Sequence, residues 1–391
     1  MEIIGYIRLQ EAFMTSHCEL TRRAFLTGSA SAALLAASGV AAKVAAAAAR
    51  PRYAESIVID ALASPGYFNY PIDVPLNAAM VRNAVASGIT AGNLTVSRAD
   101  FAQTVAQIAA WMRSMERFPA AFAHVRSVAD IRAAKAAGKF GIVFGFQDTT
   151  PLQGDLDKLE VFDNLGVRIV QLTYNVRNLA GDGCLEPANG GLSRYGHALI
   201  EAMNQRGMLV DLSHCGQRTT AEAIAASKKP VAITHSGCNE VSRHPRGKDD
   251  AELRALAQSG GVIGIYLMPF LVAGRAPTLG DVIAHIEHAV KVCGEDHVGL
   301  GSDLSTTPID GSEEYWSQHR AFVKRRIEQG IAAPGEDPEI LFTVGELNHA
   351  RRMELIANEL SARGHSAARI EKILGGNFLR LFGAVWPAAY Q

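Results

Sequence analysis

Short runs of apolar residues, rich in Val, Ile and Leu, recur along the chain from residue 57 onward. Runs of this length and composition, set off by turn-forming residues, are typical of buried β-strands. Eight of them occur, at residues 57–62, 89–96, 141–147, 168–173, 208–213, 231–234, 262–267 and 297–302. The pattern therefore predicts eight buried strands.

Segments with helical periodicity lie between these runs. They cover residues 101–117, 128–137, 156–165, 194–206, 220–227, 251–258 and 279–293, and two more follow at 346–362 and 367–382. Strands that alternate with helices indicate βαβ units and a parallel sheet. Eight units predict an α/β fold, a (β/α)₈ TIM barrel over residues 50–391, closed by the C-terminal helices. A doubly wound open sheet is the alternative, but no Gly-x-Gly-x-x-Gly motif follows the first run.

Charge and cysteine content remove several classes of function. The 391 residues include 38 Lys and Arg against 39 Asp and Glu, a formal net charge of −1, and the longest basic run is residues 324–326. Nucleic-acid binders need a basic surface for phosphate contacts, so nucleic acid is not an expected partner. The five cysteines show no Cys-x-x-Cys spacing, which argues against a zinc finger or a redox motif. A disulfide in an oxidising compartment is the alternative, with no pairing indicated by the sequence, but we expect buried thiols.

The first 49 residues predict an export signal rather than part of the fold. Arg22 and Arg23 precede a weakly apolar stretch at 27–42, and no acidic residue lies between Glu19 and Glu55. This is typical of a twin-arginine signal, which implies a periplasmic or otherwise exported protein and the twin-arginine translocation machinery as a partner. A membrane anchor and a disordered tail are the alternatives, but an anchor needs about 20 strongly apolar residues.

Polar side chains follow several of the predicted strands. They are Gln147, Asp148, Tyr174, Asn175, His214, His235 and Asp303. Active sites of such barrels lie at the C-terminal ends of the strands, so these side chains are expected to converge at one mouth. Two imidazoles with a carboxylate suit a metal that activates water. A nucleophile is less well supported, because no Gly-x-Ser-x-Gly motif occurs and Cys215 lies next to His214 rather than opposite it.

Several segments resemble the membrane (renal-type) dipeptidase family of zinc peptidases. The resemblance covers residues 57–382 and is carried, in order, by segments 168–184, 191–196 and 207–214, and by Thr234-His-Ser236, His244-Pro-Arg246, Gly299-Leu-Gly-Ser-Asp303 and Gly375-Gly-Asn-Phe-Leu379. It implies the same barrel fold. It also implies that His214 and His235 bind the second zinc of the family, that Asp303 is the acid/base carboxylate, and that Arg246 holds the C-terminal carboxylate of a dipeptide.

The other half of the metal site departs from the family pattern. Leu62 and Ser64 stand where the family has the His-x-Asp pair that binds the first zinc, Gln147 replaces the bridging glutamate, and Tyr174 replaces a histidine. Two dications about 4 Å apart need an anionic bridge, which a neutral amide does not supply. We therefore expect one metal per chain, Zn²⁺ or another divalent ion, on His214 and His235, completed by Asp303, Asp148 or the Gln147 oxygen.

The expected function is metal-dependent hydrolysis of a dipeptide or similar small amide. Asp303 would move the proton, and Arg246, Tyr174 and Asn175 would contact the peptide substrate. The alternative is a non-hydrolytic peptide-binding or natural-product maturation protein that keeps the dipeptidase pocket, and a weaker one is a lyase or isomerase acting on a peptidic natural product. The sequence leaves a homodimer open.

Overall fold

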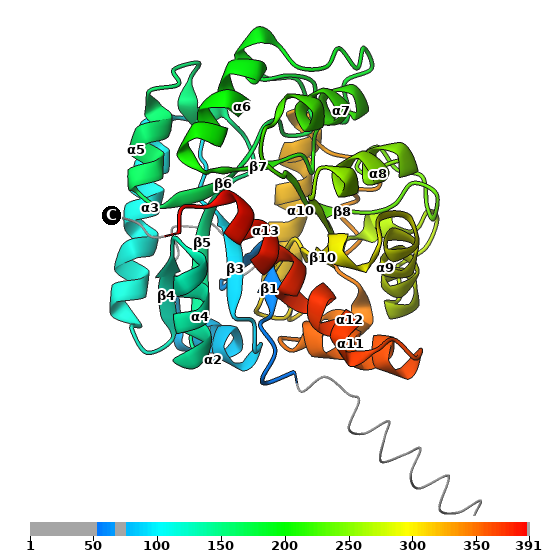
Figure 1. Ribbon diagram of the computed structural model, residues 1–391. Helices are drawn as coiled ribbons and strands as arrows, with labels where there is room; N and C mark the ends of the chain where they lie inside the picture. Colours follow the sequence, from blue (N-terminus) through cyan, green and yellow to red (C-terminus); the bar gives the residue numbers. More distant parts are fainter. Residues whose placement is uncertain (1–52, 67–75, 389–391) are drawn as a thin grey trace, which may run out of the picture. The chain divides into compact units, whose positions relative to one another are not determined.

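A computed structural model describes residues 53–66 and 76–388, and it contains a closed barrel of eight parallel strands (Figure 1). The strands are β1 (Ile59–Asp60), β3 (Ala91–Thr95), β5 (Phe140–Phe146), β6 (Val167–Gln171), β7 (Leu209–Asp211), β8 (Ala232–Ser236), β9 (Val262–Ile265) and β10 (Val298–Leu300). Pairing of β3 with β5 and of β1 with β10 closes the ring. Each of the eight predicted runs overlaps one of these strands, so the predicted barrel is confirmed.

The strands of the barrel pair over different lengths. A short strand that the pattern did not predict, β4 (Phe122–Val125), pairs with the first half of β5, and β6 pairs with the second half. β1 and β10 share one register pair, Asp60 with Leu300, and β7 and β8 also share one, Asp211 with Ala232. Beyond β1 and β10 the chain continues as β2 (Ala63–Ser64) and β11 (Leu304–Ser305), a small parallel pair at the mouth.

Helices surround the barrel, and three of them, α3, α6 and α9, have the predicted bounds. The set is α2 (Ala78–Ala86), α3 (Phe101–Arg117), α4 (Val128–Ala136), α5 (Lys158–Asn164), α6 (Arg194–Arg206), α7 (Gln217–Ala226), α8 (Asp250–Gln258), α9 (Leu279–Cys293), α10 (Glu313–Glu328), α11 (Arg352–Ala362), α12 (Ala367–Glu371) and α13 (Asn377–Val385). Helix α9 begins where the Thr278 side chain accepts from the Asp281 backbone N–H and Asp281 reaches back to Thr278, a capping box.

The C-terminal helices differ from the prediction in their bounds but close the barrel as expected. Residues 345–347 form a separate 3₁₀ turn, so α11 begins at Arg352. Helix α13, red in Figure 1, packs Phe378, Leu381 and Phe382 against strand residues such as Val143 and Ile169. A Cβ at Gly299 would lie 2.5 Å from the Phe378 ring, so this close approach of helix and strand requires glycine.

Residues 53 onward belong to one compact unit. The predicted export signal at 1–49 lies outside the described residues. Within the described part of the chain, no helix combines the length and apolar character needed to cross a membrane.

Candidate active site

Three of the predicted site residues meet at the mouth of the barrel, each just after or near the end of a strand. His214 follows β7, His235 lies in β8, and Gln147 follows β5. The two Nε2 atoms of the histidines are 2.9 Å apart, and the Gln147 side-chain nitrogen is 3.4 Å from the His235 Nε2. Both imidazoles are buried. The structure therefore brings these three predicted residues together.

Asn175 determines which nitrogen of His214 carries the proton. The Asn175 side-chain nitrogen donates to the carbonyl oxygen of Ile331 at 2.7 Å, which turns its Oδ1 toward the Nδ1 of His214 at 2.6 Å. An amide oxygen only accepts, so the hydrogen-bond network assigns an Nδ1–H to His214. The Nε2 of His214 therefore presents a lone pair to the mouth.

A buried carboxylate does the same for His235 through a hydroxyl group. The Thr234 hydroxyl donates to the Asp211 carboxylate at 2.6 Å, and the Ser213 hydroxyl donates to the same carboxylate at 2.6 Å. Because its hydrogen is engaged, the Thr234 oxygen accepts from the Nδ1–H of His235, which lies 2.8 Å away. His235 therefore also presents its Nε2 lone pair to the mouth.

Two lone pairs facing each other at 2.9 Å repel unless a cation lies against both. A proton is a poor cation here, because burial, assisted by the charge of Arg246, lowers the pKa of both histidines well below 6.5. Two nitrogens bound to one Zn²⁺ at about 2 Å each lie roughly 3 Å apart. The donor set fits one divalent metal. Among residues 53–66 and 76–388, no group of three or more His, Cys, Asp or Glu side chains is arranged to hold a metal ion.

Asp303 stands at the mouth in a backbone conformation that few residues adopt. Its φ is 59°, in the left-handed region, and its backbone N–H donates to the Leu62 oxygen at 2.9 Å. Aspartate and asparagine tolerate this conformation better than other non-glycine residues. Burial raises the pKa of the Asp303 carboxyl to about 7, against the opposing charges of Arg246 and Arg326. A carboxyl group with such a pKa both accepts and releases protons near neutral pH.

Arg246 is buried rather than an ordinary surface charge. It is 2% exposed, and one guanidinium nitrogen donates to the backbone oxygen of His235 at 3.1 Å. Its Nε has no hydrogen-bond partner among the described residues, and the guanidinium lies 5.8 Å from the centre of the Tyr266 ring. A buried guanidinium with an unused donor suits a carboxylate ligand.

The other predicted residues occupy different places. Asn175 is buried against His214, and the Tyr174 ring stacks on the His214 ring at 4.2 Å between centroids. Asp148 directs its carboxylate to the backbone N–H and hydroxyl of Thr150 in the turn after β5. The structure thus joins Tyr174 and Asn175 to the histidine pair and engages Asp148 in a local turn.

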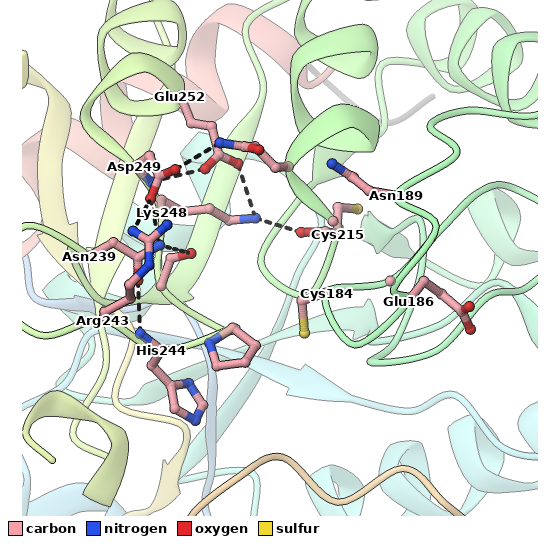
Figure 2. A pocket seen from close by; sticks show the side chains of 15 residues that line it. Cys184, Glu186, Asn189, Cys215, Asn239, Arg243, His244, Lys248, Asp249 and Glu252 are labelled. Atoms are coloured by element: carbon pink, nitrogen blue, oxygen red, sulfur yellow. Dashed lines mark hydrogen bonds and ion pairs between the residues drawn. The ribbon is translucent and has the colours of Figure 1, made fainter.

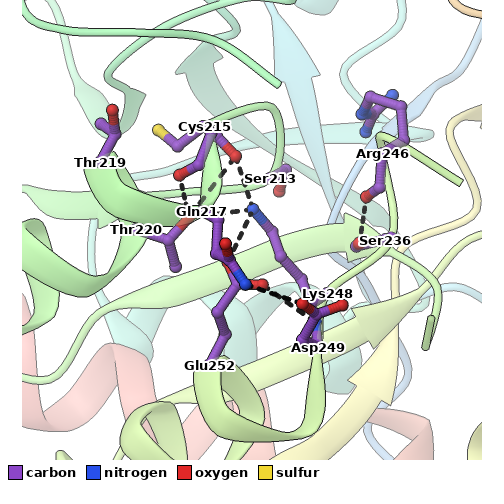
Figure 3. A network of polar contacts seen from close by, with 12 residues as sticks. Ser213, Cys215, Gln217, Thr219, Thr220, Ser236, Arg246, Lys248, Asp249 and Glu252 are labelled. Atoms are coloured by element: carbon purple, nitrogen blue, oxygen red, sulfur yellow. Dashed lines mark hydrogen bonds and ion pairs between the residues drawn. The ribbon is translucent and has the colours of Figure 1, made fainter. Parts of the chain in front are cut away.

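A pocket of about 370 Å³ lies between the loops that follow β6, β7 and β8 (Figure 2), and neither His214 nor His235 is among the residues that line it. Lys248 lines it and is 2% exposed. Its ammonium donates to the Cys215 backbone oxygen at 2.8 Å and to the Thr220 hydroxyl at 3.0 Å, as Figure 3 shows. Lys248 therefore ties the loop that carries Arg246 to the residue after His214. Sequence reasoning missed it, because a single lysine in a polar loop carries no signal.

The four cysteines in the described part of the chain show no sign of a nucleophilic role. Cys215, Cys238 and Cys293 are buried and Cys184 is partly buried, and all four are free thiols. Burial raises the pKa of the Cys215 thiol to about 11, so the reactive thiolate is scarce at neutral pH. The expectation of buried thiols is thus confirmed for three of the four.

Together the barrel and its mouth define a (β/α)₈ protein of the metal-dependent hydrolase type. A family model described as membrane dipeptidase, peptidase family M19, matches residues 71–333. The chain belongs to this family.

Individual relatives agree with this assignment. The chain is 33% identical to an uncharacterised dipeptidase of Schizosaccharomyces pombe and 29% identical to Dipeptidase verJ of Clonostachys rogersoniana, over 67% and 69% of its own length. It spans 65% and 62% of those proteins. A solved amidohydrolase from Pseudomonas aeruginosa is 34% identical with a TM-score of 0.76, and the match covers 85% of this chain and 98% of that one. A metallo peptidase from Rhodobacter sphaeroides, liganded with a phosphinate mimic of the dipeptide L-Ala-D-Ala, shares the fold at 19% identity and a TM-score of 0.69, over 85% of this chain and all of that one.

Proposed function

We propose that this protein hydrolyses a dipeptide or similar small amide with a single divalent metal, Zn²⁺, held by His214, His235 and the side-chain oxygen of Gln147. The observation that carries the proposal is the pair of buried Nε2 lone pairs facing each other at 2.9 Å. Membership of the membrane dipeptidase family supports the reaction class. Gln147 contributes its oxygen after its terminal amide group rotates so that the oxygen and nitrogen exchange places. The broad, two-fold torsion of this group permits the rotation.

The residues around the metal have separate tasks. A divalent metal at this position would polarise the amide carbonyl and lower the pKa of a water molecule. Asp303 takes the proton from the attacking water and gives it to the leaving amine, for which its pKa of about 7 is suited. Arg246 binds the free C-terminal carboxylate of the substrate through its unused Nε donor. Tyr174 and Asn175, which the sequence suggested as substrate contacts, instead support the His214 ring in this proposal.

A panel of L,L, L,D and D,L dipeptides, assayed with Zn²⁺, Mn²⁺ and Co²⁺, tests the proposal. We expect turnover of at least one dipeptide that stops when a chelator removes the metal. The same dipeptide with an amidated C-terminus is the matched control, and it should react about 10- to 100-fold more slowly, since it forfeits a charge-assisted contact with Arg246. No turnover across the panel would overturn hydrolysis. Saturable peptide binding without turnover would favour the peptide-binding alternative.

We also propose export through the twin-arginine route, on the strength of Arg22 and Arg23 before the weakly apolar stretch. Changing both residues to lysine is expected to leave unprocessed protein in the cytoplasm, as measured by cell fractionation and the mass of the product. The matched control changes Arg50 and Arg52 to lysine, outside the paired motif. Normal export of the Arg22→Lys/Arg23→Lys variant would disprove the route.

A further inference from the structure

One segment far from the histidines in the sequence reaches back to the mouth of the barrel. It runs from residue 326, near the end of α10, to residue 336, and we call it the clamp segment. Its contacts with the mouth are made by the Arg326 side chain and by two backbone oxygens, those of Ile331 and Pro334. Each contact ends on a residue of a loop that follows β6 or β8.

Arg326 is fixed in place by a carboxylate of the same segment. Its Nε and one terminal nitrogen donate to the two oxygens of Glu336, the second at 2.7 Å, and the Glu336 side chain is 3% exposed. The other terminal nitrogen donates to the Tyr174 hydroxyl at 3.0 Å. A bidentate pair fixes the plane of a guanidinium, so the donor that holds Tyr174 has a defined direction.

Two contacts of the His214 ring, those with Tyr174 and Asn175, depend on this segment. The Tyr174 ring, held by Arg326, stacks on the His214 ring at 4.2 Å between centroids and 24° between planes. Asn175, whose amide is turned by the Ile331 oxygen, accepts from the His214 Nδ1 at 2.6 Å. One contact fixes the tilt of the imidazole, and the other fixes its rotation and its tautomer.

We propose that Arg326 and Glu336 are positioning residues that hold His214 in its metal-binding orientation through Tyr174 and Asn175. The inference rests on the metal site of the proposed function. Outer groups that orient a ligand histidine contribute to metal affinity, because an imidazole free to turn loses binding energy when the metal fixes it. Arg326 touches neither substrate nor metal in this account, so its effect is expected on metal binding first.

The same helix offers a matched control. Arg320 of α10 makes an equivalent bidentate contact with Glu339, at 2.8 and 3.0 Å. Within the described part of the chain, the hydrogen bonds of Arg320 reach neither Tyr174 nor Asn175. The pair has the same chemistry and lies six positions before Arg326 on the helix, but its side chains are more exposed. Any general effect of removing an arginine–glutamate pair from α10 should appear in both.

The experiment compares Zn²⁺ affinity, measured by competition with a chelating dye, in three full-length proteins. The Arg326→Gln/Glu336→Gln variant, which leaves no uncompensated buried charge, should bind Zn²⁺ about 10- to 100-fold more weakly than the parent. The Arg320→Gln/Glu339→Gln control should stay within about twofold of it. The visible absorption spectrum of the Co²⁺-loaded protein, which reports ligand geometry, should change only in the first variant.

Equal affinity and an unchanged Co²⁺ spectrum in the Arg326→Gln/Glu336→Gln variant would overturn the inference. If that variant does not fold, Tyr174→Phe decides, since it keeps the stacked ring and the ion pair and removes only the hydroxyl that Arg326 binds. We expect Tyr174→Phe to weaken Zn²⁺ binding roughly tenfold, and parent-like affinity would overturn the inference. Failure of the proposed function would show in a different measurement, the dipeptidase assay. The parent protein would then bind Zn²⁺ but hydrolyse no dipeptide.

Discussion

Alanine at His214 or at His235 is expected to abolish tight Zn²⁺ binding and, with it, dipeptide turnover. Each imidazole is one of two nitrogen donors that converge on the same point, 2.9 Å apart. No carboxylate or thiolate of the described residues forms a three-member group with them, so one histidine and a neutral amide would remain. Metal content after dialysis, together with turnover at saturating substrate, measures the effect.

His197 provides the control for this experiment. It lies exposed on α6, so His197→Ala should leave both the metal content and the rate at parent values. A His214→Ala or His235→Ala protein that still carries one Zn²⁺ per chain would show that the metal binds elsewhere. The site assignment would then be wrong.

The Asp303→Asn variant is expected to keep the metal and to lose activity by about 10² to 10⁴. Asparagine matches aspartate in size and adopts the left-handed conformation, with φ of 59°, that this position requires. The fold and the hydrogen bond from residue 303 to the Leu62 oxygen are therefore retained. What is lost is the carboxylate that moves the proton.

The turnover number of Asp303→Asn, measured at a confirmed metal content, checks this prediction. Asp310→Asn serves as its control, because Asp310 is exposed in the same connection. A turnover number within about tenfold of the parent at Asp303→Asn would remove the acid/base role. A loss of metal from that variant would instead make Asp303 a ligand.

The barrel was predictable because its strands are buried on both faces and so read as continuous apolar runs. The parts that escaped prediction carry weaker signals. In β4, two of four residues, Ala123 and His124, are only partly buried, which breaks the run. Helix α10 has a narrow buried stripe of Tyr315, His319 and Val323 within a highly charged sequence, so its polar residues hide its periodicity.

The site also contains residues that could be predicted from the sequence and residues that could not. His214, His235 and Gln147 could be predicted because barrel topology brings strand ends together whatever the loops do. Lys248 and Arg326 could not, since their roles depend on where a loop and a helix fold back over the mouth. In the sequence, nothing distinguishes these two residues from ordinary surface charges. Their burial, rather than their spacing, identifies them.

Two neighbouring strand pairs of the barrel, β1–β10 and β7–β8, share only one register pair each. A buried carboxylate adds a hydrogen bond at both. Beyond the β1–β10 pair, the Ser302 amide donates to Asp60 at 2.7 Å, and beyond the β7–β8 pair, the Thr234 amide donates to Asp211 at 2.9 Å. Strand pairs with few backbone hydrogen bonds are where a native protein opens locally. Among the barrel strands, amide hydrogen exchange should therefore be fastest at the β1–β10 and β7–β8 pairs. These strand pairs lead to Asp303 and His235, so we expect local opening of the wall to displace both residues at the mouth of the barrel.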